Sequence, residues 1–215
     1  MNVATPKQYL KLAGRSLIAH TIERLAGVAD IAAVVVVTAP GDACWARIRA
    51  GLETEVLEAE GGAERCDSVL NGLAALRARA AADDWVLVHD AARPCVRRAD
   101  IERLMRDAGE NGCGGLLATP LNDTIKRDDG AQYVAATIDR NGLWRALTPQ
   151  MFRLGALESA LRSARASGVA VTDEAQAMEL TGAAPRLVRG HPDNIKVTVP
   201  DDLRLAELYL RMQAG

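Results

Sequence analysis

Hydrophobic residues along this chain alternate between helical spacing and short continuous runs rich in β-branched side chains. Apolar runs of about four to eight residues, bounded by turn residues, are typical of strands buried in a parallel sheet. Strands alternating with helices predict an α/β fold with a doubly wound, mostly parallel sheet. The predicted strands cover 31–38, 54–59, 85–89 and 115–119, and the predicted helices cover 16–27, 42–50, 64–82 and 100–108.

The alternation stops between about 121 and 150, where the pattern predicts a β-hairpin arm. Residues 123–127 and 132–138 read as two strands around the turn Asp128-Asp-Gly130. An Asp-Gly pair between two such segments is a strong hairpin signal. The pattern alone leaves open whether this arm covers a sheet edge or grips a second subunit.

The remainder of the chain returns to helices and short strands. Pro200 suits the first position of the last helix, where its missing N–H costs nothing. Neither repeats nor a linker divides the chain, so we expect one domain over 1–215. The predicted helices cover 154–167, 173–180 and 200–212, and the predicted strands cover 186–189 and 195–198.

Composition narrows the function classes. The 26 basic and 28 acidic residues give a net charge of −2, which argues against a generally basic nucleic-acid surface. No apolar run approaches the roughly 20 residues of a membrane span, and the N-terminus lacks a signal-peptide pattern. The four cysteines form no C-x-x-C pair and read as reduced thiols. We therefore expect a cytoplasmic protein without a membrane or nucleic-acid partner.

The segment Trp85-Val-Leu-Val-His-Asp-Ala-Ala-Arg-Pro94 places charged residues directly after a predicted buried strand. In open α/β sheets, ligands bind at the carboxyl ends of such strands. Asp90 and Arg93 therefore stand where a metal or substrate ligand is expected. The alternative interpretation is that Asp90 caps the turn and Arg93 is a solvated surface charge, and this segment alone leaves both open.

Cationic residues and a second acid lie near the ends of other predicted elements. Lysine is scarce, and Lys7 and Lys196 both adjoin predicted turns, as do Asp193 and Arg140. Acids with convergent cations suit Mg²⁺-assisted phosphoryl or nucleotidyl transfer. No Walker A loop, dinucleotide-binding G-x-G-x-x-G or G-x-S-x-G elbow is present. The three histidines are too few and too scattered to suggest a metal site.

Five motifs occur in order along the chain, and together they are specific. They are P-K-Q-Y-L, G-G-A-E-R-C-D-S-V, V-H-D-A-A-R-P, D-R-N-G-L-W-R-A-L-T-P-Q-M-F and D-N-I-K-V-T. From Pro6 to the C-terminus the chain resembles the 2-C-methyl-D-erythritol 4-phosphate cytidylyltransferase family. The resemblance implies a Rossmann-like nucleotidyltransferase fold. It also implies transfer of CMP from CTP to methylerythritol phosphate, with release of pyrophosphate and with Mg²⁺ or another divalent cation as cofactor.

The resemblance also implies a role for each matching residue. Lys7 stabilises charge on the CTP phosphates, Arg140 and Lys196 orient the attacking phosphate, and Asp90 is the magnesium-associated acid. The arm reaches a second subunit in this family, so the resemblance implies a homodimer. Substrate-binding roles fall on Gly62, Ala63, Ser68, Ala91, Arg93, Thr124, Thr172 and Asp193.

The chain departs from the family pattern at its start. The family pattern begins with a strand and a glycine-rich loop of the type A-A-G-x-G-x-R-M, and Met1 aligns with the methionine that closes this loop. A missing central strand leaves neighbouring backbone groups unpaired. We therefore expect in-frame codons upstream of Met1, and we expect the 215-residue chain alone to bind CTP weakly and turn over little.

Three alternatives compete with this function. A ribitol 5-phosphate cytidylyltransferase shares the fold, but members of that group tend to replace the two alanines Ala91 and Ala92. An inactive truncated paralogue fits the missing loop but not the retained Lys7, Asp90, Arg140 and Lys196. Fusion to a second pathway enzyme finds no support in a chain that ends just after its last predicted helix.

Overall fold

The computed structural model describes residues 6–214. Its elements, in chain order, are η1 (Lys7–Tyr9), β1 (Lys11–Leu12), β2 (Arg15–Ser16), α1 (Leu17–Ala26), β3 (Val35–Thr38), α2 (Ala43–Arg49), β4 (Leu57–Glu60), α3 (Arg65–Leu76), β5 (Trp85–Val88), α4 (Arg98–Glu110), β6 (Gly115–Pro120), β7 (Ile125–Asp128), β8 (Val134–Ile138), β9 (Trp144–Arg153), α5 (Leu154–Ala166), α6 (Glu174–Glu179), β10 (Arg186–Arg189) and α7 (Pro200–Ala214).

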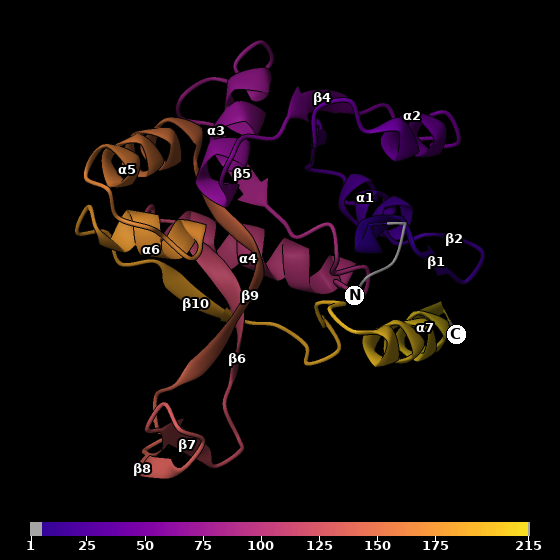
Figure 1. The fold of residues 1–215 in the computed structure, drawn as a ribbon. Helices are drawn as coiled ribbons and strands as arrows, with labels where there is room; N and C mark the ends of the chain where they lie inside the picture. The colour runs from indigo at the N-terminus through magenta and orange to yellow at the C-terminus, as the bar shows by residue number, and fades with distance from the viewer. Residues whose placement is uncertain (1–5, 215) are drawn as a thin grey trace.

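The main sheet has four strands in the order β10-β6-β9-β5 (Figure 1). Strand β10 runs parallel to β6, while β9 runs antiparallel to both of its neighbours. Helices α3, α5 and α6 pack on one face around Phe152, and α4 packs on the other face around Leu117. The predicted doubly wound α/β class is confirmed, and β9 makes the main sheet a mixed one.

Strands β3 and β4 form a separate parallel pair (Figure 1). Within residues 6–214, no strand pairs with the second edge of β3 or of β5. Helix α3 bridges the two sheets: Leu73 lies in one apolar cluster with Val86 of β5, and Gly72 packs against Val37 of β3. The two sheets therefore share a helical layer, while their backbones are not joined by a ladder.

The arm is the hairpin of β7 and β8, which projects from the far ends of β6 and β9 (Figure 1). Its turn contains Gly130 at φ +91°, in the left-handed region that favours glycine. The carboxylate of Asp129 accepts hydrogen bonds from the amides of Ala131 and Tyr133, at 2.8 and 3.2 Å. The predicted hairpin with an Asp-Gly turn is thus present.

Three sequence predictions need correction. Residues 195–198 form no ladder strand; Val197 donates one backbone hydrogen bond, of 2.8 Å, to Ala92. The predicted strand at 31–38 begins only at Val35, where pairing with β4 starts. The predicted helix at 64–82 ends at Leu76, because the next amides, beginning with that of Arg77, bond in tight turns.

The largest omission is β9, because the sequence pattern places residues 144–150 in the arm and predicts no element for residues 151–153. Pro149 lies inside this strand, and proline is unusual in a central strand because it cannot donate to the ladder. The β6–β9 register shifts between Leu116 and Ala118, opposite the segment that holds Pro149. An irregularity of this kind accommodates a proline. No described helix is long and apolar enough to cross a bilayer.

Candidate active site

Asp90 lies just past the carboxyl end of β5, where the sequence placed it. Its amide donates a 3.0 Å hydrogen bond to Thr148 Oγ1 on the neighbouring β9. The amide of Arg93 donates to the Asp90 carbonyl at 3.0 Å and closes a turn. The strand end and this turn together fix the direction in which the Asp90 carboxylate points.

Two cations converge on this carboxylate. Arg93 Nε lies 3.0 Å and Lys196 Nζ lies 3.2 Å from the same oxygen, Asp90 Oδ2. Burial acts to raise the pKa of Asp90, but the charges of Lys196 and Arg93 outweigh it and hold that pKa below its ordinary value. Arg93 is fixed in turn, because its Nη1 donates to the Asn194 carbonyl at 2.8 Å.

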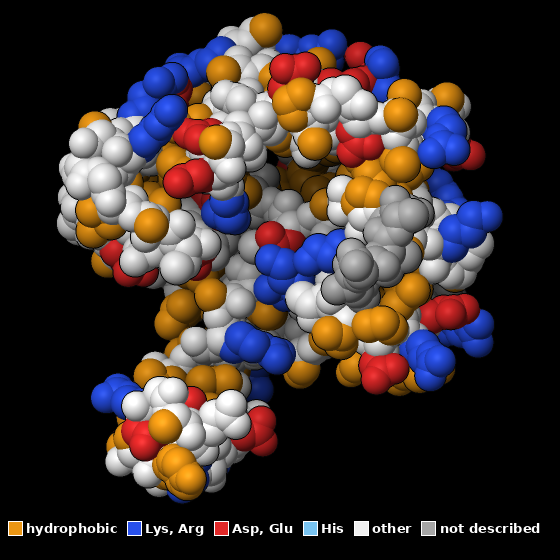
Figure 2. Space-filling view, in the orientation of Figure 1, with side chains coloured by type: hydrophobic (Ala, Val, Ile, Leu, Met, Phe, Trp, Pro, Cys, Tyr) orange, Lys and Arg blue, Asp and Glu red, His pale blue; other side chains and the backbone are white. Residues whose placement is uncertain are grey.

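A cleft of about 270 Å³ opens beside this cluster. Figure 2 shows acidic and basic side chains gathered on the floor of a central hollow whose upper wall is largely hydrophobic. The cleft lies between the end of β3 and the residues that directly follow β5. Its lining comprises Lys7, Gln8, Tyr9, Ile18, Val37, Thr38, Ala39, Asp90, Ala91, Ala92 and Lys196.

The predicted residues Lys7, Asp90, Ala91 and Lys196 thus meet in one cleft, with Arg93 bonded to Asp90. Lys7 belongs to η1, which is anchored through the Tyr9 hydroxyl: it donates to the Asp42 carboxylate at 2.6 Å. Burial, the largest cause, and the Asp42 contact together raise the pKa of Tyr9 above its ordinary value, so the phenol stays a donor.

The loop with Gly62, Ala63 and Ser68 adjoins the same opening. The Gly61 amide donates a 2.7 Å hydrogen bond to the carbonyl of Thr38, which lines the cleft. Ser68 Oγ accepts from the Gly62 amide at 3.1 Å. A Cβ on Gly62 would lie 2.2 Å from Cβ of Asp67, so no other residue fits without movement of the loop.

His89, next to Asp90, is a structural residue here. Its Nε2 lies 3.1 Å from the Arg93 carbonyl and its Nδ1 lies 2.9 Å from Thr148 Oγ1. Because a carbonyl can only accept, Nε2 carries the proton and Nδ1 accepts from the hydroxyl. Desolvation of the ring lowers the pKa of His89 to about 4, so the imidazole is neutral near pH 7.

Thr124, Arg140 and Asp193 are among the predicted residues that do not line the cleft. Thr124 and Arg140 belong to the arm, which points away from the body (Figure 1); Arg140 donates to the Asn122 carbonyl there. The carboxylate of Asp193 faces Arg97 and Gln213, with its Oδ2 2.5 Å from Arg97 Nη2. The substrate roles of these residues stay predictions.

Thr172 lies on the loop before α6, which several polar contacts hold in place. Gln176 Oε1 accepts from the Thr172 amide at 2.7 Å and from its hydroxyl at 3.1 Å. Asp173 caps α6 by accepting from the Gln176 amide at 2.9 Å. Gln150, 1 % exposed, donates to Asp173 Oδ2 at 2.9 Å. The L-T-P-Q motif includes Gln150, but the sequence pattern predicts no role for it, although a polar residue inside an apolar strand is a signal for one.

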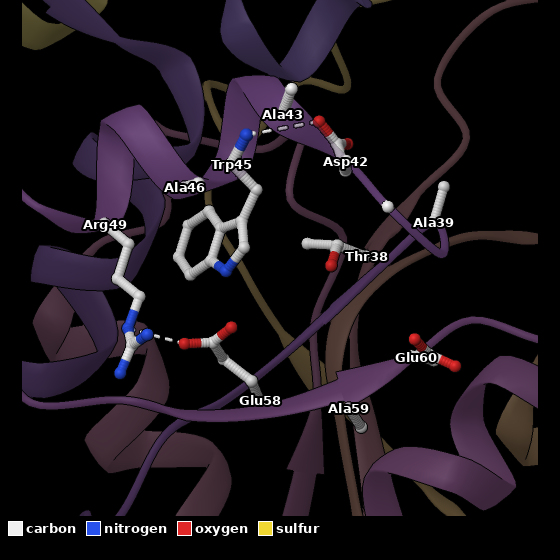
Figure 3. A pocket seen from close by; sticks show the side chains of 11 residues that line it. Thr38, Ala39, Asp42, Ala43, Trp45, Ala46, Arg49, Glu58, Ala59 and Glu60 are labelled. Carbon is white, nitrogen blue, oxygen red and sulfur yellow. Dashed lines mark hydrogen bonds and ion pairs between the residues drawn. The ribbon is translucent and has the colours of Figure 1, made fainter.

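A larger cavity of about 430 Å³ lies between α2 and the β3–β4 pair (Figure 3). The Trp45 ring lines it, and Arg49 there pairs with Glu58 at 2.5 Å. Glu58 and Glu60 line its β4 wall, so the cavity lacks the excess of cations that an anionic substrate needs. The acid and cation cluster lies in the smaller cleft, and we assign the chemistry to that cleft.

The arrangement suits a polyanionic ligand with a divalent cation. Mg²⁺ is usually bound by one or two carboxylates, water and substrate phosphates. Both ion pairs of Asp90 use Oδ2, so the carboxylate keeps Oδ1 for a cation. Among residues 6–214, no three histidine, cysteine or acidic side chains come together as a metal cage. The site therefore fits a cation shared between Asp90 and phosphates.

A doubly wound α/β fold with an acid and two lysines in a cleft at a strand end defines the class of nucleotidyltransferase-like proteins. The 2-C-methyl-D-erythritol 4-phosphate cytidylyltransferase family matches residues 1–212. The chain belongs to this family. Its function is therefore the transfer of CMP from CTP to methylerythritol phosphate in isoprenoid precursor synthesis.

Individual relatives agree with this assignment. The chain is 52 % identical over 199 residues to the enzyme of that name from Pseudomonas putida GB-1, covering 92 % of this chain and 85 % of that protein. It is 48 % identical over 210 residues to the one from Vibrio vulnificus YJ016, covering 98 % and 89 %. The relatives carry the methylerythritol phosphate name, which favours this reading over the ribitol alternative.

Solved structures resemble the fold closely. A crystal structure of 4-diphosphocytidyl-2C-methyl-D-erythritol synthase superposes with a TM-score of 0.87 at 37 % identity and covers 95 % of each chain. The Francisella tularensis 2-C-methyl-D-erythritol 4-phosphate cytidylyltransferase gives 0.85 at 33 % identity, covering 95 % of this chain and 93 % of that one.

Proposed function

We propose that the reaction takes place in the Asp90 cleft, with Lys7, Lys196 and Arg140 as its catalytic residues. The observation that carries this proposal is the convergence of Lys7, Asp90 and Lys196 on one cleft at the end of β5. Polyanionic substrates need compensating charge in a partly dehydrated site, and this cleft supplies it. Arg93 and Ala91 complete the wall nearest the phosphosugar.

The residues act mainly by positioning and charge. A phosphate oxygen of methylerythritol phosphate attacks the α-phosphorus of CTP, and the bond to the bridging oxygen breaks, so that pyrophosphate leaves. The attacking phosphate is already ionised, so no strong general base is required. Lys196 and Arg140 hold that phosphate in line, and Lys7 stabilises the charge that develops on the CTP phosphates.

Asp90 is the residue that would hold Mg²⁺. When bound, the ion neutralises phosphate charge and polarises the phosphoryl group under attack. The ion pairs of Asp90 with Arg93 and Lys196 keep its carboxylate ionised, and the ionised carboxylate is the form that binds a cation. Gly62, Ala63 and Ser68 bind the cytidine at the β3 side of the opening, and Thr172 and Asp193 serve the phosphosugar.

The chain acts as a homodimer through its arm in this proposal. Thr124 and Arg140 lie on the arm, away from the cleft of their own chain, so they would serve the cleft of a partner. Tyr133 and Val134 at the arm tip are 74 % and 66 % exposed, which suits an interface. In light scattering, Tyr133→Asp should shift the protein toward monomer, whereas Leu208→Asp, an exposed apolar position on α7, should not.

A cytoplasmic location completes the proposal. All four cysteines have free thiols, as expected in a reducing compartment. Fractionation of the source cells with an antibody against the chain should place it with cytosolic markers. Enrichment in the periplasmic fraction would contradict this assignment.

Pyrophosphate release from CTP, Mg²⁺ and methylerythritol phosphate tests the proposed function. The assay compares this chain with its Lys196→Met variant. Release that is lost in the Lys196→Met variant supports the proposal. Release with ribitol 5-phosphate alone, or release that survives Lys196→Met unchanged, would overturn it. Replacing Mg²⁺ by EDTA should abolish turnover.

A further inference from the structure

Arg65 belongs to the G-G-A-E-R-C-D-S motif, and the proposed function gives it no role. It is the first residue of α3 and directly follows the loop that holds Gly62 and Ala63. Its guanidinium makes two hydrogen bonds to the Glu174 carboxylate, of 2.5 and 2.8 Å. Such bidentate pairs are both strong and directional.

Glu174 lies on the other substrate loop. It is the first residue of α6, two positions after Thr172, and it is completely buried. A buried carboxylate requires a compensating partner, and Arg65 supplies both hydrogen bonds through two parallel donors. The partners are 109 positions apart in the sequence, so the contact joins distant parts of the chain.

The loop at Thr172 has a second, separate attachment. Gln150 on β9 donates to Asp173 at 2.9 Å and accepts from the Ala175 amide at 2.8 Å. This tie fixes the Thr172 loop to the main sheet but does not reach α3. The Arg65–Glu174 pair is therefore the polar contact that relates this loop to the start of α3.

We infer that the Arg65–Glu174 pair is a positioning clasp that sets the nucleotide loop, 61–68, against the phosphosugar loop, 171–176. The inference rests on the substrate roles proposed for Gly62, Ser68 and Thr172. Both loops must hold their ligands in line for the transfer, so a shift of either one misplaces the reacting atoms. Neither Arg65 nor Glu174 needs to touch substrate to have this effect.

Amide hydrogen exchange tests the clasp without any ligand. In Glu174→Gln, which removes the charge but keeps the shape, exchange should rise in both loops. Arg77→Gln is the matched control, because Arg77 at the other end of α3 pairs with Glu158 at 2.5 Å and reaches neither loop. Faster exchange confined to 171–176 in Glu174→Gln, or equal changes in Arg77→Gln, would overturn the clasp.

Ligand binding by the same proteins then separates the contacts. Calorimetry should show about tenfold weaker binding of both CTP–Mg²⁺ and methylerythritol phosphate in Glu174→Gln. Gln150→Met should weaken the binding of methylerythritol phosphate alone, and Arg77→Gln should weaken the binding of neither ligand. Arg65→Lys should weaken the binding of both ligands less than Glu174→Gln does. Weakening of only one ligand in Glu174→Gln would overturn the inference.

A parent chain that binds neither ligand would count against the proposed function and not against the clasp. In that case the exchange experiment still decides, because it reports on the loops themselves. Exchange that rises in both loops of Glu174→Gln, and in neither loop of Arg77→Gln, would support the clasp even then. Arg65→Lys gives the necessary second variant, since it keeps the charge that buried Glu174 requires.

Discussion

The two sheets of this molecule differ in how completely their strands are packed. In β6 and β9, side chains such as Leu117 and Phe152 are fully buried. In β3, only Val36 is buried, and its neighbours Val35 and Val37 are half-buried although they are also valines. This difference in burial accompanies a difference in pairing, because β6 and β9 have ladder neighbours on both edges and β3 has one on a single edge.

The same difference divides the site. The proposed phosphosugar side is built on β9 and its neighbours, where Asp90, Arg93 and Thr172 are each held by several hydrogen bonds. The proposed nucleotide side is built on η1, the β3–β4 pair and the loop before α3, and α3 packs between this pair and the main sheet. Preorganisation is therefore concentrated on one half of the cleft.

Lys196→Met should have the largest effect, because it removes a charge from the preorganised side. We expect kcat/KM for pyrophosphate release to fall about 10²–10³-fold, as for other groups that stabilise developing charge. Lys11→Met is the control, since Lys11 is exposed on β1 outside the cleft. Equal losses in the two variants would contradict the assignment of Lys196.

Lowering the pH should destabilise the half of the site built on β9, through protonation of His89. The folded-state pKa of about 4 lies below the ordinary 6.5, so between these values the unfolded chain binds a proton that the folded chain does not. Stability therefore falls as pH falls from about 6.5 to 4, by roughly 3 kcal/mol. In urea titrations, the unfolding free energy of His89→Gln should change less with pH over this window than that of the parent chain. An equal change in both proteins would contradict this role of His89.

Matched valine truncations measure the contrast between the sheets directly. Val188→Ala on β10 empties a site that is 2 % exposed and should cost about 2 kcal/mol of unfolding free energy. Val35→Ala on β3 should cost less than about 1 kcal/mol, because this side chain is only half-buried. Equal costs in urea denaturation would show that the β3–β4 pair is packed as tightly as the main sheet.

Much of this organisation could be predicted from the sequence, because its signals are local. The apolar run that ends at Asp90, the Asp-Gly turn of the arm and the capping residue of α2 each depend on a few adjacent residues. Asp90, Lys7 and Lys196 were found because charged residues at strand and turn ends are conspicuous. Their meeting in one cleft follows from the topology.

Other features depend on distant residues and escaped prediction. Strand β9 contains Pro149 and the buried Gln150, both of which argue locally against a central strand. A shift of register and a partner loop make both residues acceptable. The prediction for residues 195–198 is wrong for the opposite reason. Their local pattern is strand-like, but they pair with no strand, and Val197 donates a single backbone hydrogen bond to the carbonyl of Ala92.

Strand β9 also connects the arm with the loops of the cleft. It enters the body from the arm at Trp144 and ends at Arg153, a length of about 30 Å for ten extended residues. Along it, Thr148 and Gln150 hold the loops of its own cleft. In the proposed dimer, this one strand would connect residues that serve the partner's cleft with the loops of its own cleft, so that the two centres would share one stretch of backbone.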